Sequence, residues 1–262
     1  MREGMCERLT VWLLLVLAVV VTTGSCDRLF FPQVQPCQGN KLPKLRLNQS
    51  GYVQYSVYDV DMPELSSFTM HYWFNLIDAN RTATTFNYAL DLAKNNNNLT
   101  VQLERGQPQH WTMQINDMLV SRVVSPLVEA GVWYHMLHSW NSATGQWSVF
   151  MNGKILATGH NSLSVGLKIP GGGIPASGQH QNTALFMGMD QGEGIEGWFT
   201  LFQMSSRPLH SPYSKATANT VEALASQCSR DLVCDIVSWR GTPRKGYGGV
   251  TETPGQEDCG DF

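Results

Sequence analysis

The sequence predicts an all-β fold, an antiparallel β-sandwich with one short helix near its C-terminal part. Three observations lead to this prediction. Short segments rich in aromatic and β-branched residues recur along the chain, turn residues such as Gly and Asn separate them, and only one stretch is compatible with a helix. Many short strands with few helices are typical of two stacked antiparallel sheets.

The pattern becomes strand-like from about Leu45. The segment Gly51–Tyr58 alternates apolar and polar side chains, as a half-buried strand does. The aromatic segment Phe68–Phe74 is the next strand. Further short strands are expected at Tyr88–Leu92, Leu99–Leu103, Trp111–Ile115, Leu119–Val124, Trp133–Ser139, Trp147–Met151, Ile174–Gly178 and Gly197–Met204.

The connections and the C-terminal part complete the prediction. Asn152-Gly153 lies between two apolar runs, which indicates a tight hairpin turn. Tyr213–Ala225 is rich in Ala and is the predicted helix, and Asp235–Trp239 is the predicted closing strand. The remainder, Arg240–Phe262, is polar and rich in Gly and Pro, which predicts a mobile tail.

The first 26 residues have the pattern of a secretory signal peptide. Arg2 and Arg8 precede an unbroken apolar run, Val11–Val21, and small residues follow as far as Cys26. This run is shorter than the roughly 20 residues that span a bilayer, although a signal anchor remains an alternative. We therefore predict a secreted, extracellular protein with no transmembrane segment.

Cysteine usage agrees with export. Cleavage after Cys26 leaves an even number of cysteines, all of which can pair in an oxidising compartment: Cys37, Cys228, Cys234 and Cys259. Three pairings are open, and the sequence does not choose among them. Three sequons mark the predicted N-glycosylation sites Asn48, Asn80 and Asn98.

The chain thus divides into a signal peptide (1–26), a lead-in (27–44), a sandwich domain (45–239) and a tail (240–262). The formal net charge is −3, and no basic face is apparent, so a nucleic-acid partner is not expected. The sequence contains no nucleophile elbow, paired-histidine zinc motif or phosphate loop.

One block resembles a known family. Residues 135–142 read His-Met-Leu-His-Ser-Trp-Asn-Ser, and they are similar to the pentraxin pattern at His135, Ser139, Trp140 and Ser142. The glycine of the following Trp-x-Ser-x-x-Gly segment and the Asn-Gly-Lys hairpin at residues 152–154 continue the match. The resemblance extends from about Leu45 to Trp239 and implies a jelly-roll sandwich of the concanavalin-like type. Another concanavalin-like sandwich, such as a laminin-G module, is the alternative.

Two departures from the family pattern occur together. Pentraxins have a disulfide whose two cysteines correspond to His71 and Leu137 in this chain. Both cysteines are absent, so the resemblance implies a domain that packing holds together in place of that internal bridge.

The resemblance also implies a calcium site built from two loops. The corresponding residues of this chain are Asn96, Asn97, Gln181, Asn182, Asp190 and Glu193, with His180 in place of a family carboxylate. Calcium prefers six to eight oxygen ligands, several of them charged. Because Asp190 and Glu193 are the carboxylates that remain, we expect calcium binding to be weak or absent.

The sequence gives little support for a histidine metal site or for glycosidase activity. His135 and His138 are three residues apart on a predicted strand, so they should point to opposite faces and cannot share a metal ion. A glycosidase would need two carboxylates flanking a sugar, and the nearest candidates, Asp190, Glu193 and Glu196, lie in a Gly-rich segment. We therefore expect a protein without enzymatic activity.

Two functional hypotheses follow. The first is a secreted recognition protein that binds an extracellular glycan, phospholipid headgroup or protein, with calcium as a doubtful cofactor. The second is a calcium-independent structural or signalling protein that kept only the sandwich. The resemblance to pentraxins also implies homo-oligomers, because that family forms cyclic assemblies.

Overall fold

The computed structural model describes residues 42–49, 53–90, 97–179, 193–209, 211–226 and 235–254. The chain divides into two compact units, Met1–Gln35 and Pro36–Phe262, and every described residue belongs to the second. The predicted signal peptide lies outside the described residues, as do Cys37, Cys228, Cys234 and Cys259.

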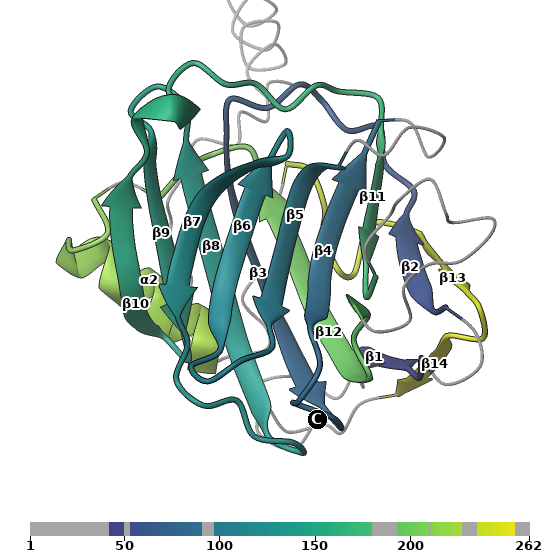
Figure 1. The fold of residues 1–262 in the computed structure, drawn as a ribbon. Coiled ribbons are helices and arrows are strands. Elements are labelled where there is room, and N and C mark those ends of the chain that lie inside the picture. The colour runs from purple at the N-terminus through teal and green to yellow at the C-terminus, as the bar shows by residue number, and fades with distance from the viewer. Residues whose placement is uncertain are drawn as a thin grey trace, which may run out of the picture. The chain divides into compact units, whose positions relative to one another are not determined.

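Two antiparallel sheets form a sandwich (Figure 1). The first sheet has the order β10-β9-β8-β3-β12-β1-β14 and the second has the order β13-β2-β11-β4-β5-β6-β7. The strands of the first sheet are β10 (Lys154–His160), β9 (Gln146–Met151), β8 (Trp133–Asn141), β3 (Ser67–Leu76), β12 (Gly197–Ser205), β1 (Pro43–Leu47) and β14 (Thr251–Pro254). Those of the second are β13 (Arg244–Tyr247), β2 (Tyr55–Tyr58), β11 (Ile174–Ser177), β4 (Ala83–Ala89), β5 (Asn97–Glu104), β6 (His110–Ile115) and β7 (Met118–Val124). The predicted fold class is confirmed.

The inner faces of the two sheets share one aromatic core. Phe74 of β3 meets Trp111 of β6 edge-on at 5.5 Å between ring centroids, and Phe86 of β4 stacks on Phe202 of β12 at 4.9 Å. All four side chains are buried. Large aromatic side chains bury much apolar area, so this contact between the sheets is a main source of stability.

The predicted hairpin is present between β9 and β10. Asn152 and Gly153 have φ angles of 48° and 78°, the left-handed values that a two-residue turn of this kind requires. Asn152 also accepts a hydrogen bond from the backbone N–H of His135 through its Oδ1 atom, at 2.9 Å. The turn therefore fixes β9 and β10 against the neighbouring strand β8.

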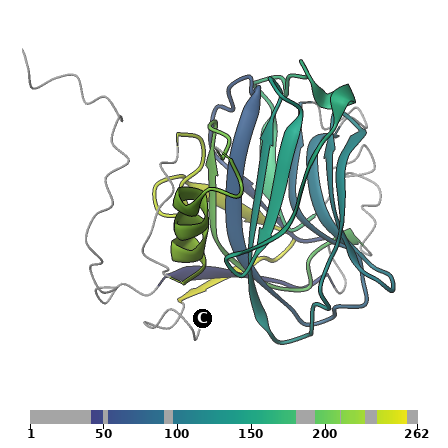
Figure 2. The ribbon, with the colours of Figure 1, turned by 90° about the vertical axis from the view of Figure 1, so that its left-hand side faces the viewer.

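Helix α2 (Lys215–Ser226) confirms the predicted helix within two residues. Ser214 precedes it and accepts a hydrogen bond from the backbone N–H of Thr217 through its Oγ atom, at 3.1 Å. Figure 2 shows the helix on the outer side of the first sheet. Its buried side chains Val221 and Leu224 pack there on Leu137 and Phe150.

The C-terminal part corrects the prediction of a mobile tail from residue 240 onward. Strand β13 pairs with β2 in the second sheet, and β14 pairs with β1 in the first. The guanidinium of Arg244 lies over the ring of Trp239 at 4.0 Å from its centroid and donates to Glu252 at 3.1 Å. These contacts order residues 244–254, while residues 255–262 lie outside the described part.

Two further predicted strands differ in extent from those in the structure. The expected closing strand Asp235–Trp239 is reduced to a single bridge between Val237 and Met204. The strand expected at Tyr88–Leu92 begins earlier, as β4, because the run of β-forming residues starts at Ala83.

Candidate functional site

A cluster of amides and a hydroxyl lies on β4 and β5, at one end of the first predicted calcium loop. Asn87 of β4 donates from its Nδ2 atom to Asn97 Oδ1 and to Thr100 Oγ1, both at 2.8 Å. Asn87 and Thr100 are directly opposite each other in the antiparallel pair, so their side chains share one face of the sheet. The neighbouring residues Phe86 and Tyr88 belong to the core, which places the cluster on the outer face.

The second predicted loop begins and ends beside the same strand. Its closing residues Gly194 and Ile195 are held by a bridge from Gly194 to Thr84 of β4 and by a 2.9 Å hydrogen bond from Ile195 N–H to Gly178 O. Buried Gln49 donates to the Ile195 carbonyl at 3.0 Å. A Cβ on Gly194 would lie only 2.6 Å from Gln49 Cδ, so a larger residue would displace the buried Gln49 side chain.

The fold therefore brings both predicted loops to β4. Thr84 and Asn87 are three residues apart, about 10 Å along a strand. Of the predicted calcium ligands, Asn97 lies at the start of β5 and Glu193 lies half-buried next to Gly194. Asn96, His180, Gln181, Asn182 and Asp190 are outside the described residues.

The described ligand candidates provide little negative charge. Asn97 is neutral, is 5% exposed, and its Oδ1 atom already accepts from Asn87. Glu193 is the one carboxylate of the expected set that the structure describes. No group of three or more His, Cys, Asp or Glu side chains suited to a metal ion occurs within the described ranges. This donor set is poorer than the several charged oxygens that calcium prefers.

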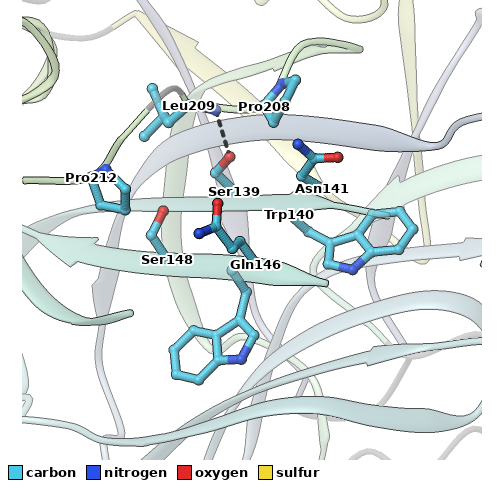
Figure 3. Close-up of a pocket in the computed structure, with 9 residues that line it drawn as sticks. Ser139, Trp140, Asn141, Gln146, Ser148, Pro208, Leu209 and Pro212 are labelled. Atoms are coloured by element: carbon cyan, nitrogen blue, oxygen red, sulfur yellow. Dashed lines mark hydrogen bonds between the residues drawn. The ribbon is translucent and has the colours of Figure 1, made fainter. Parts of the chain in front are cut away.

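The residues that give the pentraxin resemblance have structural roles (Figure 3). Ser139 Oγ accepts from the backbone N–H of Leu209 at 2.8 Å and donates to Phe68 O at 3.1 Å. Trp140 is buried and donates from Nε1 to Ser164 Oγ at 3.2 Å. A Cβ on Gly145 would lie 2.5 Å from Asn161 O, so the motif glycine is required. These contacts hold the loop that contains Leu209 against β8.

A family model described as the concanavalin A-like lectin/glucanases superfamily matches residues 47–198, more than half of the chain. The chain belongs to this superfamily. Within it, the domain is pentraxin-like. C-reactive protein 1.4 of Limulus polyphemus is 25% identical over 196 residues, which cover 74% of this chain and 77% of that protein.

Two further comparisons agree with this assignment. A rat protein with sushi, von Willebrand factor type A, EGF and pentraxin domains is 29% identical over 192 residues. That match covers 72% of this chain but only 5% of the length of the rat protein. A heptameric SAP-like pentraxin from Limulus polyphemus superposes with a TM-score of 0.68 at 19% identity, covering 82% of this chain and 95% of the other.

These relatives support a pentraxin-type binding protein. Pentraxin and laminin-G-like lectin domains are generally binding modules without enzymatic activity. Of the carboxylates considered for hydrolysis, Glu196 accepts from Arg81 at 2.7 Å and so is engaged in an ion pair. In the described segments, no helix combines the length and the apolar character that a membrane span needs.

The register supports the assignment of the two missing pentraxin cysteines. His71 of β3 and Leu137 of β8, the corresponding positions, are directly opposite each other in the sheet. In this chain, His71 contacts a second histidine instead of a disulfide partner. His71 Nδ1 lies 3.2 Å from His135 Nε2, and His71 Nε2 lies 3.1 Å from Gln203 Oε1.

The histidine prediction is confirmed. His135 lies on the outer face of the first sheet with His71, whereas His138 lies on the inner face, where its Nε2 atom is 3.2 Å from the Tyr72 hydroxyl. Both are buried. Burial lowers the pKa of His71, His135 and His138, and for His135 the neighbouring histidines lower it further. All three are therefore neutral at pH 7.

The three sequons differ in their surroundings. Asn80 is exposed, Asn48 is half-buried, and Asn98 is 8% exposed with its Nδ2 atom donating to Asn116 Oδ1 at 3.1 Å. A glycan on Asn98 would replace that donor and would need open solvent. Asn80 is therefore the sequon that best fits glycosylation, which stays a prediction.

Asn87 and Thr100 were not among the residues predicted from the sequence. The available signal was a polar residue between two aromatic ones, Phe86-Asn87-Tyr88, in a segment rich in β-formers. Such a residue faces outward from a strand with an apolar inner face. Its contact with Asn97 depends on the pairing of β4 with β5, which no local pattern reveals.

Proposed function

We propose that this chain is a secreted, pentraxin-type recognition protein whose ligand binds on the outer face of β4 and β5, and that calcium is not needed for binding. The observation that supports it most is the neutral cluster of Asn87, Asn97 and Thr100, located where the resemblance implies an ion site. The three side chains are buried and hydrogen-bonded to one another, with Asn87 0%, Thr100 1% and Asn97 5% exposed. They therefore give this face a neutral, uncharged foundation, and we propose that the ligand binds over it.

The hydrogen bond between the Asn87 and Asn97 amides argues against calcium dependence. Asn97 Oδ1 accepts from Asn87 at 2.8 Å, so this oxygen has lost part of its capacity to bind a cation. A neutral amide is also a weaker ligand for a hard cation than a carboxylate is. The alternative is a structural or signalling protein that binds only another protein. It would also bind without calcium, and it differs only in its ligand.

A ligand screen tests the proposal. The full secreted chain is applied to a glycan array, to phosphocholine and phosphoethanolamine vesicles, and to extracellular protein arrays, each in millimolar calcium and in EDTA. We expect saturable binding to one of these ligand classes, with the same affinity in calcium and in EDTA. No saturable binding in any arm, or binding that EDTA abolishes, contradicts the proposal.

A pair of variants locates the site. Gln114 is half-buried and is directly opposite Thr100, so Gln114→Trp should crowd the cluster. Gln146→Trp, at the exposed first residue of β9 in the other sheet, is the matched control. We expect Gln114→Trp to weaken binding roughly tenfold, the equivalent of about 1.4 kcal/mol. Equal affinities of the two variants would exclude this face.

A further inference from the structure

The outer face of the first sheet holds a second, different group of polar side chains. Lys44 Nζ lies 4.6 Å from the ring centroid of Trp198, and the guanidinium carbon of Arg46 lies 5.0 Å from it. Lys44 and Arg46 are two residues apart on β1, so both project from the same face. Arg46 and Trp198 are directly opposite each other, so the indole lies on that face as well.

Neither cation has a carboxylate partner among the described residues. The described salt bridges join other pairs: Arg81 with Glu196, Arg122 with Glu104, Lys168 with Glu64 and Arg244 with Glu252. Glu252 lies opposite Leu45, so it projects from the other face of β14 and β1. Like charges repel, and no described carboxylate forms a salt bridge with either cation, so a bound anion would relieve the repulsion.

The cations are also held in place before any ligand arrives. Lys44, Arg46 and Trp198 are all half-buried, and attraction to the indole restricts both basic side chains. Restricting a long side chain in the free protein lowers the entropy that binding must offset. Burial lowers the pKa of Lys44, which agrees with an ammonium group that lacks a counter-ion.

Hydroxyl groups border the cations on the adjacent edge strand. Thr253 of β14 lies opposite Lys44, and Thr251 lies opposite Arg46. The Oγ1 atom of Thr253 is buried and has no hydrogen-bond partner in the part of the chain that the structure describes. Thr251 is exposed, so the group of Lys44, Arg46, Trp198, Thr251 and Thr253 combines positive charge, an accessible hydroxyl and an aromatic ring on the outer face of the sheet.

We infer that this surface binds an anionic polysaccharide, one bearing sulfate or carboxylate groups. The two cations are spaced about 6.6 Å along the strand, which suits successive anionic groups of an extended chain. Hydroxyls bond sugar hydroxyls, and the partly exposed indole packs against the CH groups of a sugar ring. This site is on the opposite sheet from the Asn87 cluster and is independent of it.

Heparin is the probe for the test. Binding of the full chain to immobilised heparin is measured against the salt concentration for the wild type and for Lys44→Ala/Arg46→Ala. We expect the double variant to bind at least roughly tenfold more weakly, because two charge-assisted contacts are lost. The matched control, Lys154→Ala/Lys215→Ala, removes two exposed cations from β10 and α2 and should change affinity less than about twofold.

Several results would overturn the inference. Equal losses in the two double variants would mean a general charge effect, and no loss in Lys44→Ala/Arg46→Ala would exclude the site. Binding of phosphatidylserine vesicles but not heparin through these residues would assign the site to a membrane. Equal binding of heparin that has been both desulfated and carboxyl-reduced would exclude anion recognition.

Two controls show whether a loss of heparin binding comes from misfolding or from an effect on the Asn87 cluster of the other sheet. Arg46→Gln keeps most of the side-chain stem, so it should retain the melting temperature and still weaken heparin binding severalfold. Gln114→Trp should leave heparin binding unchanged, whereas Lys44→Ala/Arg46→Ala should leave the ligand of the second sheet unaffected. These variants therefore show which of the two proposed binding sites is wrong, if only one of them is.

Discussion

The buried histidines make stability depend on pH. Burial lowers the pKa of His71 to about 4 and that of His138 to about 3, from an ordinary value of 6.5. Between pH 6.5 and 4 the unfolded chain therefore binds more protons than the folded protein does. Stability is fully present above pH 6.5 and is lost as pH falls through this range.

We predict that the free energy of unfolding falls between pH 7 and pH 4, with a contribution from His71 on the order of 3 kcal/mol. Urea unfolding at several pH values measures this. His71→Leu should be less stable at pH 7, because His135 and Gln203 lose a partner, but its stability should depend less on pH. The exposed His160→Gln is the matched control and should follow the wild type. An unchanged pH slope in His71→Leu would disprove the assignment.

At the scale of elements, the pairing of β3 with β8 has replaced a covalent bridge. His71 and Leu137 are directly opposite each other, and such residues have Cα atoms about 4.5–5.5 Å apart. A disulfide accepts Cα separations of about 4.4–6.8 Å. The register of this sheet is therefore suited to a bridge that the chain lacks.

We predict that His71→Cys/Leu137→Cys forms a disulfide on oxidation. The oxidised variant should be more stable than the same variant after reduction by about 2–4 kcal/mol, because the bridge restricts the unfolded chain. Thiol titration, peptide mapping and denaturant unfolding measure these outcomes. His71→Ser/Leu137→Ser, which has no thiols, should not respond to reductant. Two thiols that stay free under oxidising conditions would show that the register is wrong.

Elements with a clear local pattern were predictable from the sequence. Strands β5, β6, β8 and β9 alternate or carry runs of aromatic and β-branched residues, and Asn152-Gly153 has the chemistry of its turn. Strands β13 and β14 were not, because their sequences, Arg-Lys-Gly-Tyr and Thr-Glu-Thr-Pro, show no apolar alternation. They are ordered by contacts distant in sequence, such as that of Arg244 with Trp239.

The candidate sites also depend on contacts between residues that are distant in sequence. Asn97 and Glu193 were found through the family resemblance, whereas Asn87 was recognised only when β4 and β5 were paired. Arg46 and Trp198 are directly opposite each other although the sequence places them far apart. A contact of this kind depends on sheet order, which local patterns do not encode.

At the scale of the whole domain, the two sheets present different chemistry on their outer faces. The second sheet has the buried neutral amides Asn87 and Asn97 beneath its outer face, and the first has two half-buried cations beside Trp198 as well as the helix α2. If each face binds its own ligand, one domain could bridge an anionic polysaccharide and a second extracellular partner. Loss of the family carboxylates at the first site is then a change of ligand chemistry rather than a loss of function.

The central claim, recognition without calcium on the β4–β5 face, is tested most directly by calcium titration calorimetry of the full secreted chain and of Asn97→Asp. The variant adds a carboxylate that can still accept from Asn87 Nδ2. We predict no heat and no shift in melting temperature for the wild type at millimolar calcium, whereas Asn97→Asp, with its added carboxylate, should give measurable heat of calcium binding. A millimolar or tighter site in the wild type, removed by Asp190→Ala, would contradict the account and would mean that the ion mechanism of pentraxins survives in this chain.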